Sequence, residues 1–173
     1  MRFAYADPPY HKQGKRHYGK HHDAAHIWDS QKAHIDLVER LVDEYPDGWA
    51  LSCNPADLRW LLDATPPHPK TRVCVYAKTF HQIRSNVSVQ YAWEPVILCG
   101  GRPITAPRKP MIRDWHPIAA IPKTRGLIGA KPVKFCEWVL DLLNFDPTQD
   151  ELDDMFPGTG VMSEVVNDRK QAA

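Results

Sequence analysis

The sequence contains no apolar run that approaches the roughly 18 to 20 residues needed to cross a membrane as a helix. Its opening, MRFAYADPPY, also lacks the charged segment followed by an apolar segment that marks a secretory signal. We therefore expect a soluble protein that is neither secreted nor inserted in a membrane and that is located in the cytoplasm.

Cysteine is scarce, and its spacing fits no metal or disulfide pattern. The four cysteines are Cys53, Cys74, Cys99 and Cys136. They lie at least twenty residues apart, which matches neither a zinc motif such as CxxC nor a compact disulfide framework. Three of them sit in apolar runs typical of strands. We expect four buried free thiols and no metal site.

Internal repeats and low-complexity segments are absent as well. A chain of 173 residues with 43% hydrophobic, 25% charged and 10% aromatic residues has the composition of one globular domain, 1–173, with its own core. The same figures exclude collagen-like and wholly disordered proteins.

A net charge of only +1 conceals two blocks of opposite sign. Residues 101–134 contain eight Lys and Arg against one Asp, a net charge of +7. Residues 137–168 contain nine acidic residues and no Lys or Arg, a net charge of −9. We interpret the first block as a basic surface for a polyanion and the second as a region that faces elsewhere; two solvated surfaces without a partner are the alternative.

Alternating strand-like runs and helical periodicities predict an α/β fold with a mainly parallel sheet of about five strands and helices on both faces. Strands are expected at 2–6, 49–53, 73–77, 96–99 and 151–156, with an extended stretch at 89–93 that is interrupted at Pro95. Helices are expected at 31–45, from Asn54-Pro55 to about 64, from Pro132, and briefly in the last dozen residues. Residues 11–30 are predicted to be a long cationic, histidine-rich loop, and residues 100–130 a basic excursion with little regular structure.

Asp7-Pro8-Pro9-Tyr10 stands where the first strand should end. The two prolines hold an extended turn without N–H groups and leave carbonyls free to accept hydrogen bonds. A carboxylate and a carbonyl can accept both hydrogens of an exocyclic amine while a tyrosine ring stacks on the attached base. The tetrapeptide therefore predicts a pocket for amino-methylation; a plain Pro-Pro turn is the alternative.

A second motif, Asp154-Met155-Phe156-Pro157-Gly158-Thr159-Gly160, follows the last predicted strand. Glycines between a strand and a helix let a ligand approach the backbone at the positive end of the helix. By itself this motif favours an ordinary strand-to-helix turn over a ligand site.

Together the two motifs resemble the Asp-Pro-Pro-Tyr target-base motif and the Asp-x-Phe-x-Gly-x-Gly cofactor motif of the S-adenosylmethionine (SAM)-dependent amino-methyltransferases of DNA. Their order resembles the circularly permuted group of adenine-N6 and cytosine-N4 methyltransferases. Over about residues 1–165, including GWALSC, YAWEPVILCGG and GAKPVKFCEWV, the chain looks like the small DNA methylases encoded by actinobacteriophages. These in turn resemble the family that methylates adenine N6 in mRNA. The resemblance implies a Rossmann-like methyltransferase fold, circularly permuted and short at its C-terminal end.

The resemblance also implies residue roles. Asp7 and the Pro8 carbonyl would hold the target amine next to Pro9, and Tyr10 would stack on the flipped base. The residues expected around the cofactor are Ala6, Lys131, Asp154, Phe156, Gly158, Thr159 and Gly160, with Lys131 near its carboxylate. A conjugated amine is a poor nucleophile, so the catalytic need is to withdraw proton density as the methyl group arrives, without a metal or a covalent intermediate.

One departure from the family concerns the ribose of the cofactor. In the family a helix, a strand ending in an acidic ribose ligand and a further strand follow the cofactor motif, whereas residues 161–168 can supply only the helix. The acidic ligand is therefore either missing or replaced, by Asp168 or by another chain. The element order of the permuted family also implies that the strand ending at Asp7 lies parallel and adjacent to an edge strand ending near Phe156, so that Asp7 and Gly158 face one crevice.

Contact with DNA is expected at residues 11–22 and 102–125, which concentrate Lys and Arg. The cations assigned to it are Lys12, Lys15, Arg16, Arg108, Lys109 and Arg113, with Trp115 as an aromatic that touches nucleic acid. His17, His21, His22 and His26 have spacings that could bind zinc on a helix, but Gly14 and Gly19 argue against a helix there, which favours a backbone contact or a lid. Trp28, Trp49, Trp60 and Trp138 are expected in the core.

The sequence therefore predicts a SAM-dependent DNA methyltransferase that acts on an exocyclic base amine, adenine N6 in preference to cytosine N4, with a homodimer or partner chain as a means of completing the pocket. The alternative from another class is a non-catalytic DNA- or partner-binding protein on a truncated methyltransferase scaffold. A small-molecule or RNA methyltransferase is the third reading.

Overall fold

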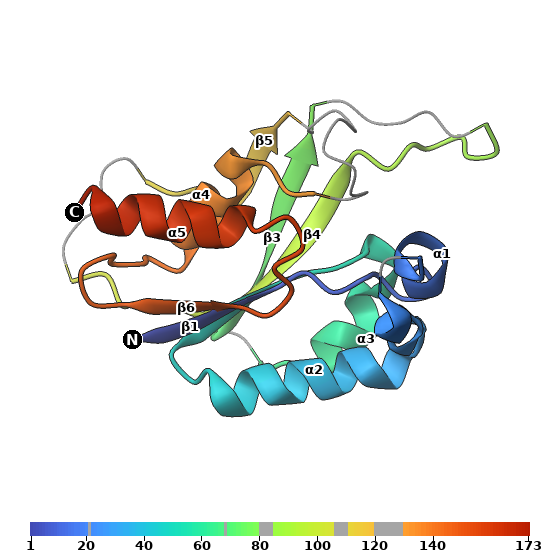
Figure 1. Cartoon of the computed structure of the whole chain (residues 1–173), viewed down its shortest axis with the longest axis horizontal. Helices are drawn as coiled ribbons and strands as arrows, with labels where there is room; N and C mark the ends of the chain where they lie inside the picture. The colour runs from blue at the N-terminus through green and yellow to red at the C-terminus, as the bar shows by residue number, and fades with distance from the viewer. Residues whose placement is uncertain (21, 68, 80–84, 106–110, 120–129) are drawn as a thin grey trace.

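A computed structural model of the chain describes residues 1–20, 22–67, 69–79, 85–105, 111–119 and 130–173 (Figure 1). Its centre is a six-stranded sheet with the order β5-β3-β4-β2-β1-β6. The strands are β1 (Arg2–Ala6), β2 (Gly48–Ser52), β3 (Thr71–Lys78), β4 (Trp93–Gly100), β5 (Trp115–Ile118) and β6 (Glu151–Asp154). The sheet has one strand more than expected, because β5 forms inside the segment predicted to lack regular structure.

Five of the six strands run in the same direction. β1 is parallel to both β2 and β6, and β3 is parallel to β5, whereas β4 is antiparallel to its two neighbours. The mainly parallel sheet predicted from the sequence is confirmed. As expected, the strand that precedes the cofactor motif, β6, lies at an edge of the sheet beside β1.

Pro95 lies within β4 and does not interrupt it, contrary to the prediction. The Pro95 carbonyl accepts a hydrogen bond from Cys53 N at 3.2 Å, so the backbone of Pro95 faces the β2 side. β2 has ended at Ser52, opposite Val96. The missing N–H of proline therefore costs no bond of the β2–β4 ladder.

Helices cover both faces of the sheet (Figure 1). On one face α2 (Gln31–Glu44) and α3 (Leu58–Asp63), preceded by η2 (Pro55–Asp57), bury the α2–α3 core. On the other face α4 (Val133–Leu142) and α5 (Val161–Gln171) bury the α4–α5 core. Alternate residues of β1 point to the two cores, Ala4 to the first and Phe3 to the second, as the period of a strand requires. The predicted helices are all present, and the Asn54 side chain accepts a hydrogen bond from Ala56 N at 3.1 Å, as a helix cap does.

Two helices form within residues 11–30, where a loop was predicted, and the prediction was wrong. They are α1 (Gly14–Tyr18) and η1 (Asp23–Asp29), while His21 lies outside the described residues. Gly14 lies in a contact between these two helices, where a Cβ atom would come within 2.1 Å of the Ala25 carbonyl oxygen. The glycine thus allows close packing and does not break the helix.

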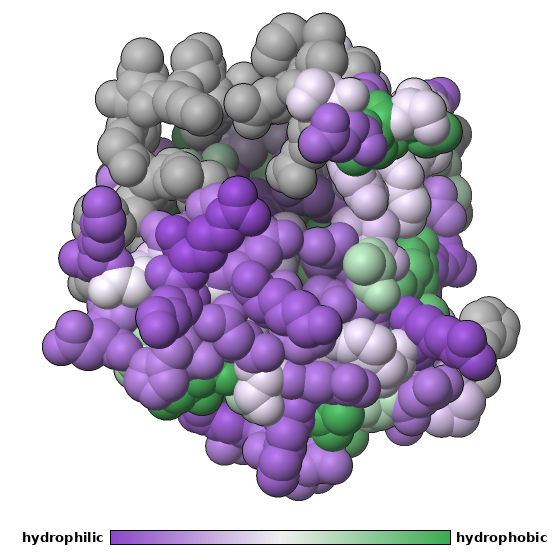
Figure 2. All heavy atoms as spheres, turned by 90° about the vertical axis from the view of Figure 1, so that its right-hand side faces the viewer, coloured by the Kyte–Doolittle hydropathy of each residue, from purple (hydrophilic) through white to green (hydrophobic). Residues whose placement is uncertain are grey.

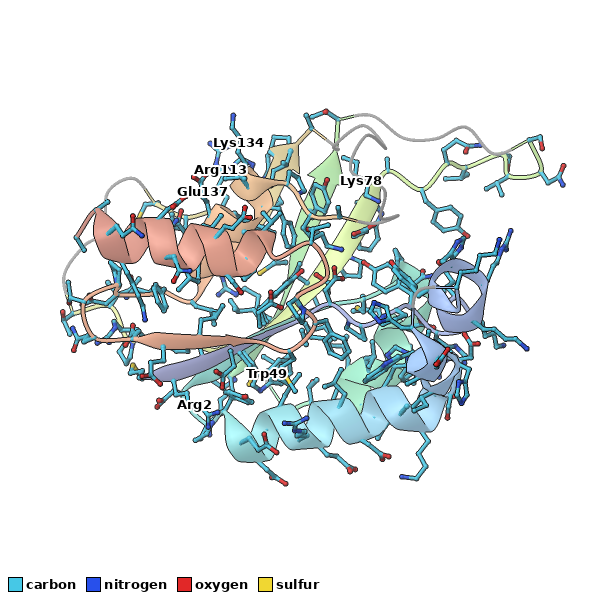
Figure 3. The ribbon with its side chains drawn as sticks, viewed as in Figure 1. Arg2, Trp49, Lys78, Arg113, Lys134 and Glu137 are labelled. Atoms are coloured by element: carbon cyan, nitrogen blue, oxygen red, sulfur yellow. The ribbon has the colours of Figure 1, made fainter. Side chains whose placement is uncertain are left out.

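All four cysteines are buried and free, as predicted. Trp49 and Trp138 are buried in the two cores, and Trp28 and Trp60 are partly buried against the α2–α3 core. Figure 3 shows Trp49 between the sheet and α2. Within the described ranges, no helix has the length and apolar character required to span a bilayer.

Candidate active site

A cavity of about 390 Å³ opens at the carboxyl ends of β1 and β6. The two strands are parallel neighbours with Tyr5 opposite Asp154, so the segments that follow them leave the sheet at the same edge. Asp7 and Pro9 from the first motif line this cavity, and so do all residues from Asp154 to Thr159 of the second motif. Asp7 and Gly158 therefore face one crevice, as the predicted topology requires.

The rest of the wall comes from three segments that are distant in the sequence. Tyr18 and Trp28 belong to the residues predicted as a loop, Lys131 precedes α4, and Val161 and Met162 begin α5. The sequence analysis did not assign Tyr18 or Trp28 to the site, because a histidine-rich segment without clear periodicity does not indicate which of its residues line a cavity.

Trp28 is held in place by contacts with Phe156 and His34. Its indole meets the Phe156 ring edge-on at 4.9 Å between centroids. Its carbonyl lies 2.9 Å from Nε2 of His34, a buried residue of α2. Burial lowers the pKa of His34, which favours the neutral ring. One wall of the cavity is thus fixed to a helix of the fold.

The backbone after β6 is shaped for close approach. Gly158 has φ = +47°, a left-handed conformation that favours glycine, and no side chain covers the cavity at this point. Asp154 accepts a hydrogen bond from Phe156 N at 3.3 Å, and burial raises the pKa of its carboxyl. The wall therefore combines an acidic group, aromatic rings and bare backbone.

Asp7 belongs to a network of four charged side chains and one tyrosine. Lys131 Nζ donates to Asp7 Oδ1 at 2.9 Å and lies 3.3 Å from Glu94 Oε2. Glu94 is also paired with Lys78, whose side chain lies at the end of β3 (Figure 3). Tyr10 Oη donates to Glu94 Oε2 at 3.0 Å, which holds the tyrosine predicted to stack on the base.

The pKa values of these groups follow from burial and pairing. Burial raises the pKa of Asp7, and Lys131 opposes this effect. Burial by itself would also raise the pKa of Glu94, but Lys131 and Lys78 lower it to about 2. Burial by itself would lower the pKa of Lys131, but Asp7 and Glu94 raise it well above its usual value. The network is ionised at neutral pH around Glu94 and Lys131.

Sequence analysis assigned Lys131 to the cofactor carboxylate and gave no role to Glu94. In the structure Lys131 lines the cavity but bonds to two protein carboxylates. The sequence feature that could have indicated Glu94 is its charge within an otherwise apolar run, Tyr91 to Cys99. Its partners could not be deduced without the pairing of β4.

Several predicted site residues lie beside the cavity and do not line it. Ala6 is fully buried in the α2–α3 core, and Gly160 caps α5 in a left-handed conformation. Pro8 is buried, and its carbonyl accepts no hydrogen bond from any described residue. Asp168, proposed as a substitute ribose ligand, is exposed on α5 and does not belong to the cavity wall.

The cations assigned to DNA are distributed over two regions. Lys12, Lys15 and Arg16 are exposed at α1, on the largely hydrophilic side of the molecule that Figure 2 shows. Arg113 is exposed and its guanidinium lies 5.9 Å from the centroid of the Trp115 ring. Arg108 and Lys109 lie outside the described residues.

The two charge blocks meet in an ion pair, although the sequence suggested that they face in different directions. Arg102 of the basic block forms an ion pair with Asp150 of the acidic block, whose side chain is fully buried. Arg102 therefore serves the fold and is not available to a polyanion.

Comparison with known proteins places the fold. No family model matches the chain, and no curated protein matches its sequence. Among solved structures, the crystal structure of the M1.HpyAVI-SAM complex superposes with a TM-score of 0.65 at 13% identity, covering 98% of this chain and 78% of that one. A crystal structure of M1.HpyAVI gives a TM-score of 0.60 at 10% identity, covering 98% and 76%. At such identities the likeness shows the fold, and the chain has the Rossmann-like methyltransferase fold that its sequence predicts.

Proposed function

We propose that this protein is a SAM-dependent methyltransferase that acts on an exocyclic amine of a DNA base, adenine N6 in preference to cytosine N4. The observation that carries the proposal is the common cavity: Asp7 and Pro9 of the first motif line it together with residues 154–159 of the second, and the two motifs follow neighbouring parallel strands. The superposable M1.HpyAVI structure was determined as a SAM complex, which supports the same cofactor here.

The cavity suits SAM in size and chemistry. A volume of about 390 Å³ falls in the range typical of small-molecule pockets, roughly 300 to 1,000 Å³. Trp28, Phe156 and Met162 offer apolar surface, and the bare backbone at Gly158 allows close approach. Asp154 supplies a carboxylate beside them. When bound, SAM supplies an electrophilic methyl group.

The residues after β1 would handle the amine. The Asp7 carboxylate in the cavity wall and the adjacent Pro8 carbonyl, which accepts no hydrogen bond from a described residue, would each accept one of its hydrogens. Lys131 holds Oδ1 of Asp7, so the carboxylate is oriented before the substrate arrives. Tyr10, held by Glu94, would offer its ring to the base. Withdrawal of proton density from the amine makes its nitrogen a better nucleophile at the moment of transfer.

The test is a pair of variants with separable defects. Asp7→Ala should reduce transfer of labelled methyl groups from SAM to DNA by at least about 100-fold, since general acid–base assistance contributes about that much or more, and should leave SAM binding nearly intact. Gly158→Leu should weaken SAM binding in calorimetry, because its side chain would enter the cavity.

Wild-type transfer by Asp7→Ala would show that the pocket is wrongly assigned. Wild-type protein that binds DNA but neither binds SAM nor transfers methyl groups would favour the non-catalytic alternative.

A further inference from the structure

The sheet presents an apolar face that no described helix covers. Val75 of β3 lies opposite Trp115 of β5 and Pro95 of β4, and Ala77 lies opposite Pro117 and Trp93. Residues in register share a face of the sheet, and so do alternate residues of one strand. We call the residues Val73, Val75, Ala77, Trp93, Trp115 and Pro117 the open face.

The open face continues the surface that α2 and α3 cover elsewhere. Val73 is in register with Ile97, which is fully buried in the α2–α3 core. The intervening residues Cys74 and Tyr76 point to the α4–α5 core. Within the described parts of the chain, no residue of the open face belongs to either core.

This composition is unusual for a sheet face that meets water. Where one face of a sheet is solvated, the strand residues that point to that face are normally polar. The residues that make up the open face are all apolar. Trp93 and Trp115 retain 39% and 46% of their exposure, so large aromatic surfaces remain uncovered. Contiguous exposed apolar surface of this kind marks a binding site.

We propose that the open face binds the unpaired bases of a single-stranded nucleic acid; this deepens the proposed function and rests on it for the link to methyl transfer. Indole rings offer stacking platforms to any base, but only if the base is not already stacked in a duplex. Arg113 lies against the Trp115 ring and can reach a phosphate next to a stacked base. Within the described part of the segment 101–134, Arg113 and Lys134 are exposed cations that can attract a polyanion.

The position of the open face connects it to the cavity. Trp93 and Ala77 lie at the edge of the sheet where β1 and β2 end, since β4 is antiparallel to β2 and begins there. Trp93 directly precedes Glu94, which holds Tyr10. Nucleotides that flank a target base in the cavity would therefore lie within reach of the two tryptophans, around the edge of the sheet.

The test is fluorescence anisotropy with a labelled single-stranded DNA of mixed sequence and with the same strand annealed to its complement. Trp93→Ala and Trp115→Ala should each weaken single-strand binding by about 5- to 100-fold, the loss expected for one stacked base, with little effect on the duplex. Trp115→Phe should retain most of the affinity, because it retains a ring. Ile104→Ala, which removes an exposed apolar side chain from the same basic segment, should bind as the wild type does.

Salt dependence distinguishes stacking from charge. The two tryptophan variants should keep the wild-type dependence of log affinity on log salt, whereas Arg113→Ala should flatten it by up to about 0.7, the value for one phosphate contact on a single strand. Unchanged single-strand affinity in both tryptophan variants would overturn the proposal. A self-associating wild type that becomes monomeric in these variants, with unchanged DNA affinity, would overturn it in favour of a protein interface.

The outcomes for the two proposals are separable. If the wild type binds single strands through Trp93 and Trp115 but transfers no methyl group, the open face is supported and the enzymatic function is not. If both tryptophan variants transfer methyl groups at the wild-type rate and bind single-stranded DNA with the wild-type affinity, the enzymatic function is supported and the open face is not.

Discussion

Lys131 and Glu94 do more for the site than their positions in the sequence indicate. Lys131 connects the carboxylate of the target-base motif to Glu94, and Glu94 in turn fixes Tyr10 and Lys78. A buried cation needs such partners, because an unpaired charge in the interior is costly. The network therefore orients Asp7 and Tyr10 before any substrate binds.

Replacing Glu94 by Gln should destabilise this network while keeping the volume of the side chain. Lys131 would retain only Asp7 as an anionic partner, so we expect a loss of about 2 kcal/mol or more in the free energy of unfolding. Urea denaturation measures the loss. The matched control is Glu137→Gln on the exposed side of α4, which should change stability by less than about 0.5 kcal/mol. Equal stability of the two variants would contradict a structural role for the network.

At the scale of elements, the reversed strand β4 decides the composition of the site. Parallel strands present their carboxyl ends at one edge, and an antiparallel neighbour begins at that same edge. Glu94, the second residue of β4, therefore shares Lys131 with Asp7, the first residue after β1. If β4 were parallel, its first residues would lie at the opposite edge of the sheet.

The contact between α1 and η1 is the second decisive arrangement of elements. η1 contributes Ala25 and Trp28 to the cavity, and α1 contributes Tyr18. Asp29 at the end of η1 accepts from the Gly14 amide at 2.8 Å, so the two helices hold each other directly. A wall of the cavity thus depends on close approach at Gly14.

Gly14→Ala should disturb this wall. A Cβ atom 2.1 Å from the Ala25 carbonyl oxygen forces the backbone of η1 to shift. We expect a loss of about 1 to 3 kcal/mol in the free energy of unfolding, as overpacking typically gives, together with weaker SAM binding. Urea denaturation and calorimetry measure these effects. Lys15→Ala, an exposed change on the same helix, is the control, and wild-type behaviour of Gly14→Ala would show that the contact tolerates a methyl group.

At the scale of the whole molecule, Asp150 ties distant parts of the chain together. Its buried carboxylate pairs with Arg102, which follows β4, with the amino group of Met1 at 2.7 Å, and with the Asp146 amide at 2.8 Å. Burial by itself would raise the pKa of Asp150, but the Arg102 hydrogen bond and the other partners lower it. The ends of β1, β4 and β6 therefore meet at one carboxylate.

The pH dependence of the free energy of unfolding should reflect the interactions of the Asp150 carboxylate. A carboxylate whose pKa is lowered by folding stabilises the protein at pH values above its unfolded pKa of 3.8. This stabilisation is lost as the pH falls through the lower pKa of the folded state. Asp150→Asn should be less stable than the wild type at pH 7, and the difference should shrink as the pH falls below about 4. Urea midpoints between pH 7 and pH 2 measure it. Asp168→Asn, on the exposed side of α5, should follow the wild-type curve throughout.

The sequence by itself determined the elements and the two motifs. Apolar periodicity identified α2 and α4, and strand-like runs identified β1, β2 and β3, because local patterning decides which face of an element is buried. Asp7 and Gly158 could be assigned to one crevice because adjacent parallel strands end at one edge. The elements needed only short-range information, whereas the adjacency of β1 and β6 was expected from the resemblance to the permuted methyltransferases.

Only the tertiary structure decided the direction of β4, the helices within residues 11–30 and the partners of Lys131. The direction of a strand is set by its neighbours, and the Pro95 imide is tolerated because β2 ends beside it. In the sequence Gly14 argues against a helix. Only the structure shows that it packs against Ala25, eleven positions away, where a side chain would not fit. The ion pairs of Lys131 join residues 37 and 124 positions apart, a separation at which local sequence carries no information about contact.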